Sequence, residues 1–217
     1  MIRPPSRPLV ITDCDEVLMH MVVPFAQWVD EAHGVLFRME DASFAGALKR
    51  KECGTPLEAA EVWPLLDGFF RTEMGRQTEI PGAMAAMAAI GDVADIVVLT
   101  NVGPDHQAAR AEQLAAIGLT APVIGSRGGK GEPVRALIEE RRPSVTVFID
   151  DLPGHHHSVA IEAPEVWRLH FVGEPAIADK VRPAKHAHAR IDDWNEARDW
   201  ILARLTENIP APAAELA

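Results

Sequence analysis

The chain has 217 residues, of which 47% are hydrophobic, so it can form one large domain or one domain with a modest insertion. Its 21 basic and 32 acidic side chains give a formal net charge of −11, which argues against a nucleic-acid-binding surface. Because it has neither the roughly 18 uninterrupted apolar residues of a membrane helix nor a signal peptide at MIRPPSRPLV, we expect a cytoplasmic protein, monomeric or homodimeric, with no nucleic-acid or membrane partner.

Short apolar segments rich in β-branched residues recur along the chain and predict strands. They lie at 9–12, 95–100, 122–124, 145–149 and 166–172. Between the later strands lie segments of helical length and pattern, at 104–117, 132–141 and 153–161. Strands that alternate with helices indicate right-handed crossovers and a parallel sheet covered on both faces. The predicted fold class is therefore α/β.

About eighty residues separate the first predicted strand from the second, which is too many for one crossover helix. Within them lie three stretches of helical character, at 20–33, 39–51 and 55–74. We therefore predict a helical subdomain over residues 19–79, inserted into an α/β core formed by residues 1–18 and 80–206.

The end of the chain has two distinct parts. Apolar residues recur at helical spacing over 193–205, which predicts a helix that packs its tryptophans on the sheet. The Pro/Ala-rich segment that follows predicts a flexible tail over residues 207–217.

Acidic side chains follow the first predicted strand. The sequence DCDE, residues 13–16, comes directly after LVIT and places three carboxylates within four residues. Because side chains alternate along an extended strand, Asp13 and Asp15 would point to the same side and could share a metal ion or a substrate. A divalent cation would relieve the repulsion between such close carboxylates. The alternative is a polar turn or a helix cap at the strand end.

Further candidate residues follow the other strands, at the carboxyl edge where open parallel sheets bind ligands. Thr100 and Asn101 follow the second strand, where a hydroxyl and backbone N–H groups could hold an anion, although both residues are also common helix caps. Lys130 lies in the glycine-rich loop SRGGKGEP, where a solvated surface lysine is the alternative. Asp150 and Asp151 follow the fourth strand and place a second acidic pair at this edge.

The combined pattern resembles the haloacid dehalogenase-like (HAD) superfamily. It comprises DxDxV after the first strand, Thr after the second, Lys before the helix that leads to the fourth, and Asp-Asp after the fourth. The similarity covers about residues 8–18 and 80–172. The resemblance implies a Rossmann-like, three-layer α/β/α core with a small helical cap inserted after the first motif.

The resemblance also implies a catalytic role for several residues. Asp13 would be the nucleophile that forms an aspartyl-phosphate, and Asp15 would be the general acid and base. Thr100 and Asn101 would bind phosphoryl oxygens. Lys130 would neutralise Asp13 and bind the phosphoryl group.

A magnesium ion is the cofactor that the resemblance implies. Its ligands would be Asp13, the backbone carbonyl of Asp15, and Asp151, a set of hard oxygen donors. Asp150 would hold a metal-bound water or Lys130.

These expectations predict a magnesium-dependent phosphate-monoester hydrolase that acts on a small phosphorylated metabolite. The main alternative is a non-catalytic or regulatory binding protein with the same fold. A dehalogenase is disfavoured because haloacid dehalogenases lack an acid at the position of Asp15. A phosphonatase would need a cap lysine, and no motif marks Lys49 or Lys51 for that role.

Two features depart from the family pattern. Glu16 stands where the family usually has glycine, so its carboxylate could repel anions, contact a cationic part of a substrate, or point to solvent. His155, His156 and His157 follow the acidic pair, with His155 where relatives often have asparagine. Consecutive residues of a helix point about 100° apart and cannot all ligate one ion, so we expect capping and local hydrogen bonds.

Overall fold

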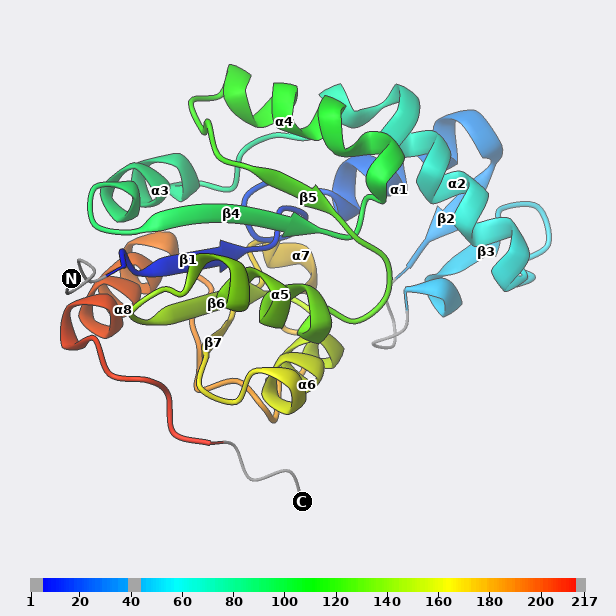
Figure 1. Cartoon of the computed structure of the whole chain (residues 1–217). Helices are drawn as coiled ribbons and strands as arrows, with labels where there is room; N and C mark the ends of the chain where they lie inside the picture. Colours follow the sequence, from blue (N-terminus) through cyan, green and yellow to red (C-terminus); the bar gives the residue numbers. More distant parts are fainter. Residues whose placement is uncertain (1–5, 39–43, 214–217) are drawn as a thin grey trace.

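A single parallel sheet forms the centre of the computed structural model, which describes residues 6–38 and 44–213 (Figure 1). In spatial order its six strands are β5 (Val123–Gly125), β4 (Asp95–Thr100), β1 (Leu9–Thr12), β6 (Thr146–Asp150), β7 (Trp167–His170) and β8 (Ala189–Arg190). Every neighbouring pair is parallel. The predicted α/β fold class is confirmed.

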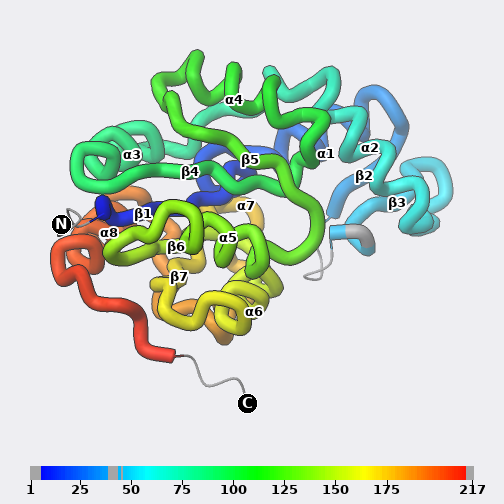
Figure 2. Tube along the Cα trace, viewed as in Figure 1, coloured from blue at the N-terminus to red at the C-terminus, as the bar shows by residue number. Residues whose placement is uncertain are grey.

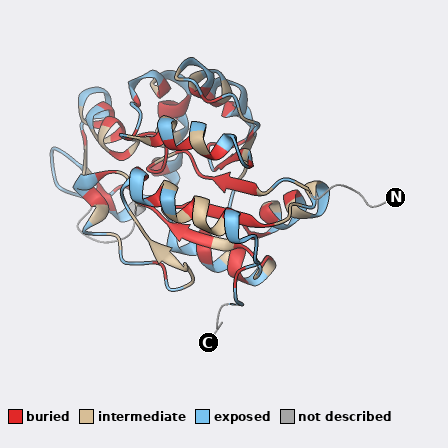
Figure 3. Ribbon diagram, turned by 90° about the vertical axis from the view of Figure 1, so that its left-hand side faces the viewer, coloured by how far each residue is buried: buried red, intermediate tan, exposed pale blue. Residues whose placement is uncertain are grey.

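Helices cover both faces of the sheet. Successive residues of β1 point to opposite faces, and each face is apolar and packs against helices. Val10 packs in a cluster with α3 (Ala83–Gly91) and α8 (Trp194–Glu207). Leu9 and Ile11 pack in another cluster with α5 (Gly131–Arg141) and α6 (Pro153–Glu162). The strands are accordingly buried, while the outer faces of the helices are exposed (Figure 3). These three layers agree with the predicted α/β/α arrangement.

Two further helices of the core, α4 (Gln107–Ala116) and the short α7 (Pro175–Ala178), follow β4 and β7. A 3-10 helix, η3 (Pro104–His106), leads into α4, which contacts β5. Among the described residues, none of the helices is both long enough and apolar enough to cross a lipid bilayer.

The chain leaves the sheet after β1 and returns to it through α3 (Figure 2). Between these points it forms α1 (Val22–His33), β2 (Val35–Phe37), η1 (Ala45–Ala47), β3 (Leu48–Arg50), α2 (Ala59–Thr72) and η2 (Met74–Arg76). We call this segment the insertion. It has an apolar cluster of its own, which includes Phe25, Trp28, Leu48, Val62 and Phe69. In Figure 1 the strands of the sheet point toward it.

The insertion is not wholly helical. The helix predicted over 39–51 is wrong for residues 44–51, where the chain forms η1 and then β3, antiparallel to β2; residues 39–43 lie outside the described part. The pairing buries Leu48 opposite Phe37, inside the aromatic cluster of the insertion. A tertiary contact therefore overrides the local helical pattern.

The end of the chain contains a helix and a segment that contacts the core. The predicted helix over 193–205 is confirmed as α8, whose first N–H groups donate to the side chain of Asp193. Glu207 is the last residue of α8, and residues 208–213 follow it without helix or strand, so the flexible tail stays a prediction. The indole N–H of Trp167 donates to Ile209 O at 2.8 Å, and Ala211 N donates to Glu165 O at 2.9 Å. Residues 214–217 of that prediction lie outside the described residues.

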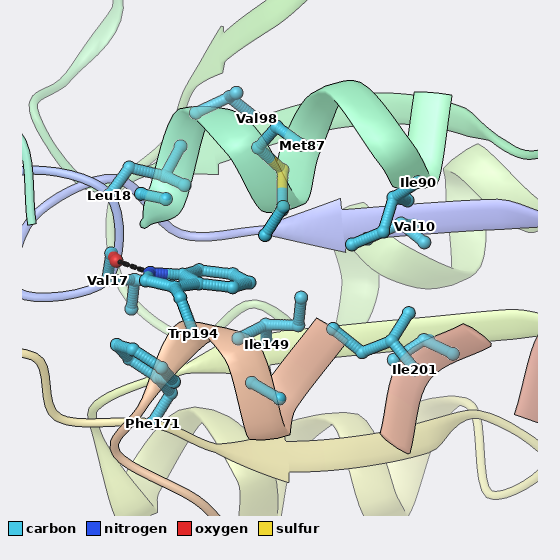
Figure 4. Packing of buried hydrophobic residues seen from close by; sticks show 14 of the residues in the cluster. Val10, Val17, Leu18, Met87, Ile90, Val98, Ile149, Phe171, Trp194 and Ile201 are labelled. Carbon is cyan, nitrogen blue, oxygen red and sulfur yellow. Dashed lines mark hydrogen bonds between the residues drawn. The ribbon is translucent and has the colours of Figure 1, made fainter. Parts of the chain in front are cut away.

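Trp194 joins α8 to the loop that follows β1 (Figure 4). Its ring is 1% exposed and lies 4.6 Å, between centroids, from the ring of Phe171. Its indole N–H donates to the carbonyl of Val17 at 2.8 Å. This contact fixes the loop that carries the acidic residues after β1.

We expect Trp194→Phe to lower the free energy of unfolding. The change leaves the buried Val17 carbonyl without its donor, which costs about 1–3 kcal/mol, and the smaller ring adds a cavity. Urea denaturation measures the loss. Trp63→Phe is the matched control, because Trp63 is 60% exposed. Equal stabilities of the two variants would contradict the role given to Trp194.

Candidate functional site

The register of the sheet brings two acidic residues together at its carboxyl edge. Thr12 lies opposite Ile149 of β6, and Asp13 N donates to Ile149 O at 2.8 Å. The next residues, Asp13 and Asp150, therefore lie side by side at the ends of the two central strands. Both are buried.

Lys130 lies between these carboxylates. Its Nζ is 2.8 Å from Asp13 Oδ2 and 2.6 Å from Asp150 Oδ2, and the residue is fully buried. The alternative of a solvated surface lysine is therefore wrong. The lysine precedes α5, where a Cβ on Gly131 would lie 2.3 Å from Ser158 O, so only glycine permits this approach of α5 to α6.

Asp150 uses both of its oxygens to hold neighbouring groups. Besides Lys130, its carboxylate accepts from Leu152 N and contacts His155 Nδ1, each at 2.9 Å. Burial opposes its ionisation, but Lys130 and His155 together hold the pKa of Asp150 below its ordinary value. Asp150 is thus an anion that positions Lys130 and His155.

The negative charges of Asp13 and Asp151 are offset by neighbouring cations less than that of Asp150 is. Burial raises the pKa of Asp13 to about 6, with Asp150 and Asp15 adding to the effect of burial and Lys130 opposing it. Burial, followed by the charges of Asp150, Asp13 and Glu16, raises the pKa of Asp151 well above its ordinary value. These carboxylates would be stabilised by a further cation.

The donor set fits a hard divalent cation. Asp13, Asp150 and His155 each offer one ligand atom within 4.8 Å of the others, but the oxygens of Asp150 are already engaged. Asp13, Asp15 and Asp151 line one cavity of about 730 Å³ between the sheet edge and the insertion. Oxygen donors of this kind suit Mg²⁺.

The residues after β4 lie at the same edge. Thr100 is fully buried, and its hydroxyl has no hydrogen-bond partner among the described residues. The side chain of Asn101 lines the cavity and joins neighbouring loops, since Nδ2 donates to Gly128 O at 3.0 Å and Oδ1 accepts from Ser126 Oγ at 2.9 Å. Asn101 is therefore largely engaged with the loops, whereas Thr100 keeps a buried, unpaired hydroxyl that does not itself line the cavity in the described part of the chain.

Several solved structures share this architecture. A haloacid dehalogenase-like protein of unknown function from Agrobacterium tumefaciens is 19% identical with a TM-score of 0.64, over 90% of this chain and 97% of its own. A HAD family hydrolase from Deinococcus radiodurans, solved with bound phosphate and sodium, is 18% identical with a TM-score of 0.62, over 96% and 99% of the two chains. A haloacid dehalogenase-like family hydrolase from Streptococcus pneumoniae is 11% identical with a TM-score of 0.62, over 91% and 98%.

The chain has the haloacid dehalogenase-like fold. No protein-family model and no curated protein sequence matches it. The likeness is therefore one of structure, and it agrees with the HAD resemblance of the four sequence motifs.

Asp15 has two partners that the sequence analysis did not identify. Its Oδ1 accepts from Arg110 Nη2 at 2.8 Å and from Gln77 Nε2 at 2.7 Å. Arg110 is fully buried and lies 5.5 Å from the ring centroid of Phe70 in α2. The sequence did contain a sign that Arg110 is buried, because it lies four residues before Leu114 and therefore on the same face of α4. An arginine on the apolar face of a helix needs a buried partner.

Glu16 replaces the usual HAD glycine without pointing to solvent. Its backbone has φ 61°, the left-handed conformation that explains a preference for glycine. Its carboxylate is buried, and Oε1 accepts from Met21 N at 2.8 Å and from Val22 N at 2.5 Å at the start of α1. The other oxygen, Oε2, has no hydrogen-bond partner among the described residues. The alternative of a solvent-directed Glu16 is therefore wrong.

The three consecutive histidines point to different partners. His155 contacts Asp150 as described above, and His156 Nε2 donates to the carbonyl of Asp150 at 2.9 Å. The ring of His157 packs on His186, with 4.6 Å between centroids. Each histidine thus has a local role, and the three do not converge on one point.

The pH dependence of stability tests the role of His156. Burial lowers its pKa from the ordinary 6.5 to about 4, and its buried Nδ1 has no hydrogen-bond partner within residues 6–38 and 44–213. The unfolded chain takes up this proton at higher pH than the folded one does. The free energy of unfolding should therefore fall by about 3 kcal/mol from this group as the pH decreases from 6.5 to 4.

His156→Gln keeps a donor for the Asp150 carbonyl but does not titrate. We expect urea denaturation to show a smaller loss of stability over this pH range for His156→Gln than for the parent. His33→Gln makes the same change at an exposed position and is expected to follow the parent. Equal losses for His156→Gln and the parent would contradict the prediction.

Proposed function

We propose that the chain is a Mg²⁺-dependent phosphate-monoester hydrolase that acts through an aspartyl-phosphate on Asp13. The observation that carries the proposal is the buried Lys130, which bridges Asp150 and Asp13; Asp13 lines a cavity together with Asp15 and Asp151. A buried carboxylate beside an ammonium can attack an anionic phosphoryl group, because the lysine offsets the repulsion between the two anions.

The first step would form a bond between an Asp13 oxygen and phosphorus, while the bond from phosphorus to the leaving oxygen breaks. Lys130 would neutralise charge on Asp13 and on the phosphoryl group. The unpartnered hydroxyl of Thr100 would donate to a phosphoryl oxygen. The phosphate bound to the Deinococcus radiodurans protein of the same fold supports a phosphoryl ligand.

Asp15 would transfer the protons. In the first step it would protonate the leaving oxygen, and in the second it would take a proton from the water that hydrolyses the aspartyl-phosphate. Arg110 and Gln77 both contact Oδ1, so the proton would be carried by Oδ2. These two residues orient the carboxylate and keep it apart from Asp13.

Mg²⁺ would be held by Asp13, the backbone carbonyl of Asp15, and Asp151. When bound, it would supply positive charge that offsets the carboxylates and the phosphoryl oxygens. Asp150 would act indirectly, by holding Lys130.

The first test is phosphate release from phosphorylated small molecules with and without Mg²⁺. Asp13→Asn removes the nucleophilic oxygen and is expected to lower kcat by at least about a thousand-fold, since covalent catalysis is lost. Asp199→Asn makes the same change at a side chain that is 69% exposed and should retain parental activity. Metal-dependent release that survives Asp13→Asn would overturn the proposed mechanism.

The second test measures metal binding without turnover. Mg²⁺ should raise the Tm of the parent, by the equivalent of about 2.7 kcal/mol when its concentration is a hundred times Kd. Asp151→Asn should lose most of this shift. Without Mg²⁺ this variant should be at least as stable as the parent, because it removes a half-buried carboxylate whose charge is opposed by neighbouring anions.

Asp199→Asn again serves as the control and should keep the parental shift. A shift of the same size in the Asp151→Asn variant would exclude Asp151 as a ligand.

A further inference from the structure

The cavity at the sheet edge has two chemically different ends. Its acidic side chains at the sheet edge, Asp13, Asp15, Glu16 and Asp151, follow β1 and β6. Asn101, Arg127 and His155 add polar side chains from the segments that follow β4, β5 and β6. The insertion contributes an almost wholly apolar wall, formed by Met21, Val22, Phe44, Trp63, Leu66 and Phe70. Among the described residues of the insertion, Asp67 supplies the one polar side chain on this wall, and its Oδ1 is already 2.9 Å from His106 Nε2.

The core extends this apolar wall. Val102, Leu152, Ile177 and Val181 line the cavity from the loops and the short helix that follow β4, β6 and β7. Apolar side chains thus make up most of this part of the lining, which also includes Asp67 and Arg127.

Two of the apolar side chains in this lining are exposed to solvent. Among the described residues, five large hydrophobic side chains are exposed, and two of them, Trp63 at 60% and Leu152 at 47%, line this cavity. Removing apolar surface from water lowers the free energy by about 25 cal/mol per Å². An apolar group of a ligand would cover both.

A sugar or another polyol would bind poorly against this wall. Each hydroxyl that leaves water needs a hydrogen-bond partner, and an unpaired one costs about 1–3 kcal/mol. The apolar wall offers few such partners. The cavity volume of about 730 Å³ is nevertheless within the range of pockets that enclose organic molecules.

We propose that the substrate is a phosphate monoester of an apolar alcohol, whose alkyl or aryl group packs against the insertion while its phosphate meets Asp13 and Lys130. This inference rests on the proposed phosphatase function. It adds that the alcohol released by hydrolysis is apolar and has few hydroxyl groups.

A series of n-alkyl phosphates from ethyl to octyl tests the inference. Their leaving alcohols have similar acidity and the esters carry the same charge. Differences in kcat/KM therefore report the contacts that the alkyl group makes with the protein. Each methylene that is buried is worth about 0.8 kcal/mol, which predicts up to about a four-fold rise in kcat/KM for each added carbon. We expect octyl phosphate to exceed ethyl phosphate by at least about a hundred-fold, and hexose phosphates to lie near the ethyl ester.

Variants of the wall locate the effect. Trp63→Ser and Leu66→Ser should lower kcat/KM much more for octyl phosphate than for ethyl phosphate. Ile161→Ser replaces an apolar side chain that is 48% exposed on α6, outside the cavity, and should keep the parental dependence on chain length.

Binding of n-alkylphosphonates separates this inference from the proposed function, because their carbon–phosphorus bond is not a substrate for ester hydrolysis. Calorimetry with the Mg²⁺-loaded protein should show affinity that rises with chain length and falls in Trp63→Ser. Affinity and kcat/KM that do not depend on chain length would overturn the inference and leave the phosphatase function standing. Chain-dependent affinity without turnover of any ester would overturn the phosphatase function and the substrate class with it, and would leave only the binding of an alkyl group to the apolar wall.

Discussion

The ammonium group of Lys130, enclosed between Asp13 and Asp150, sets the geometry of the whole sheet edge. Like charges on the two central strands would repel at this distance, and the lysine converts that repulsion into attraction. Because the lysine precedes α5 and the carboxylates end β1 and β6, one buried charge group joins two strands and a helix. The contacts that hold the candidate catalytic residues are thus also contacts that pack the core.

Much of this edge could be predicted from the sequence. Apolar runs of strand length stand out, and in a parallel sheet the residues after each run must meet at one edge, which is why Asp13, Asp15, Lys130 and Asp150 could be named together. The contacts of Arg110 could not, because its partner Asp15 lies 95 residues away and nothing local marks the pairing. The β2–β3 hairpin was missed for a similar reason, since Leu48 is held in a strand by the aromatic cluster around it.

Asp15 connects the two parts of the molecule. Gln77 lies where the chain returns from the insertion, whereas Arg110 belongs to α4 of the core, and both donate to the same carboxylate oxygen. Arg110 also lies over Phe70 of the insertion, and Gln113 Nε2 donates to Met74 O at 2.7 Å. A change in the position of the insertion would therefore move the groups that hold Asp15, so the apolar wall of the cavity and this carboxylate are mechanically linked.

The order of the strands has a consequence for self-association. The long strands β1, β4 and β6 are interior, while the two edges are formed by β5, with three residues, and β8, with two. Edge strands this short present few unpaired backbone N–H and C=O groups to another chain. The edges of the six-stranded sheet are therefore poor templates for pairing with a strand of another copy.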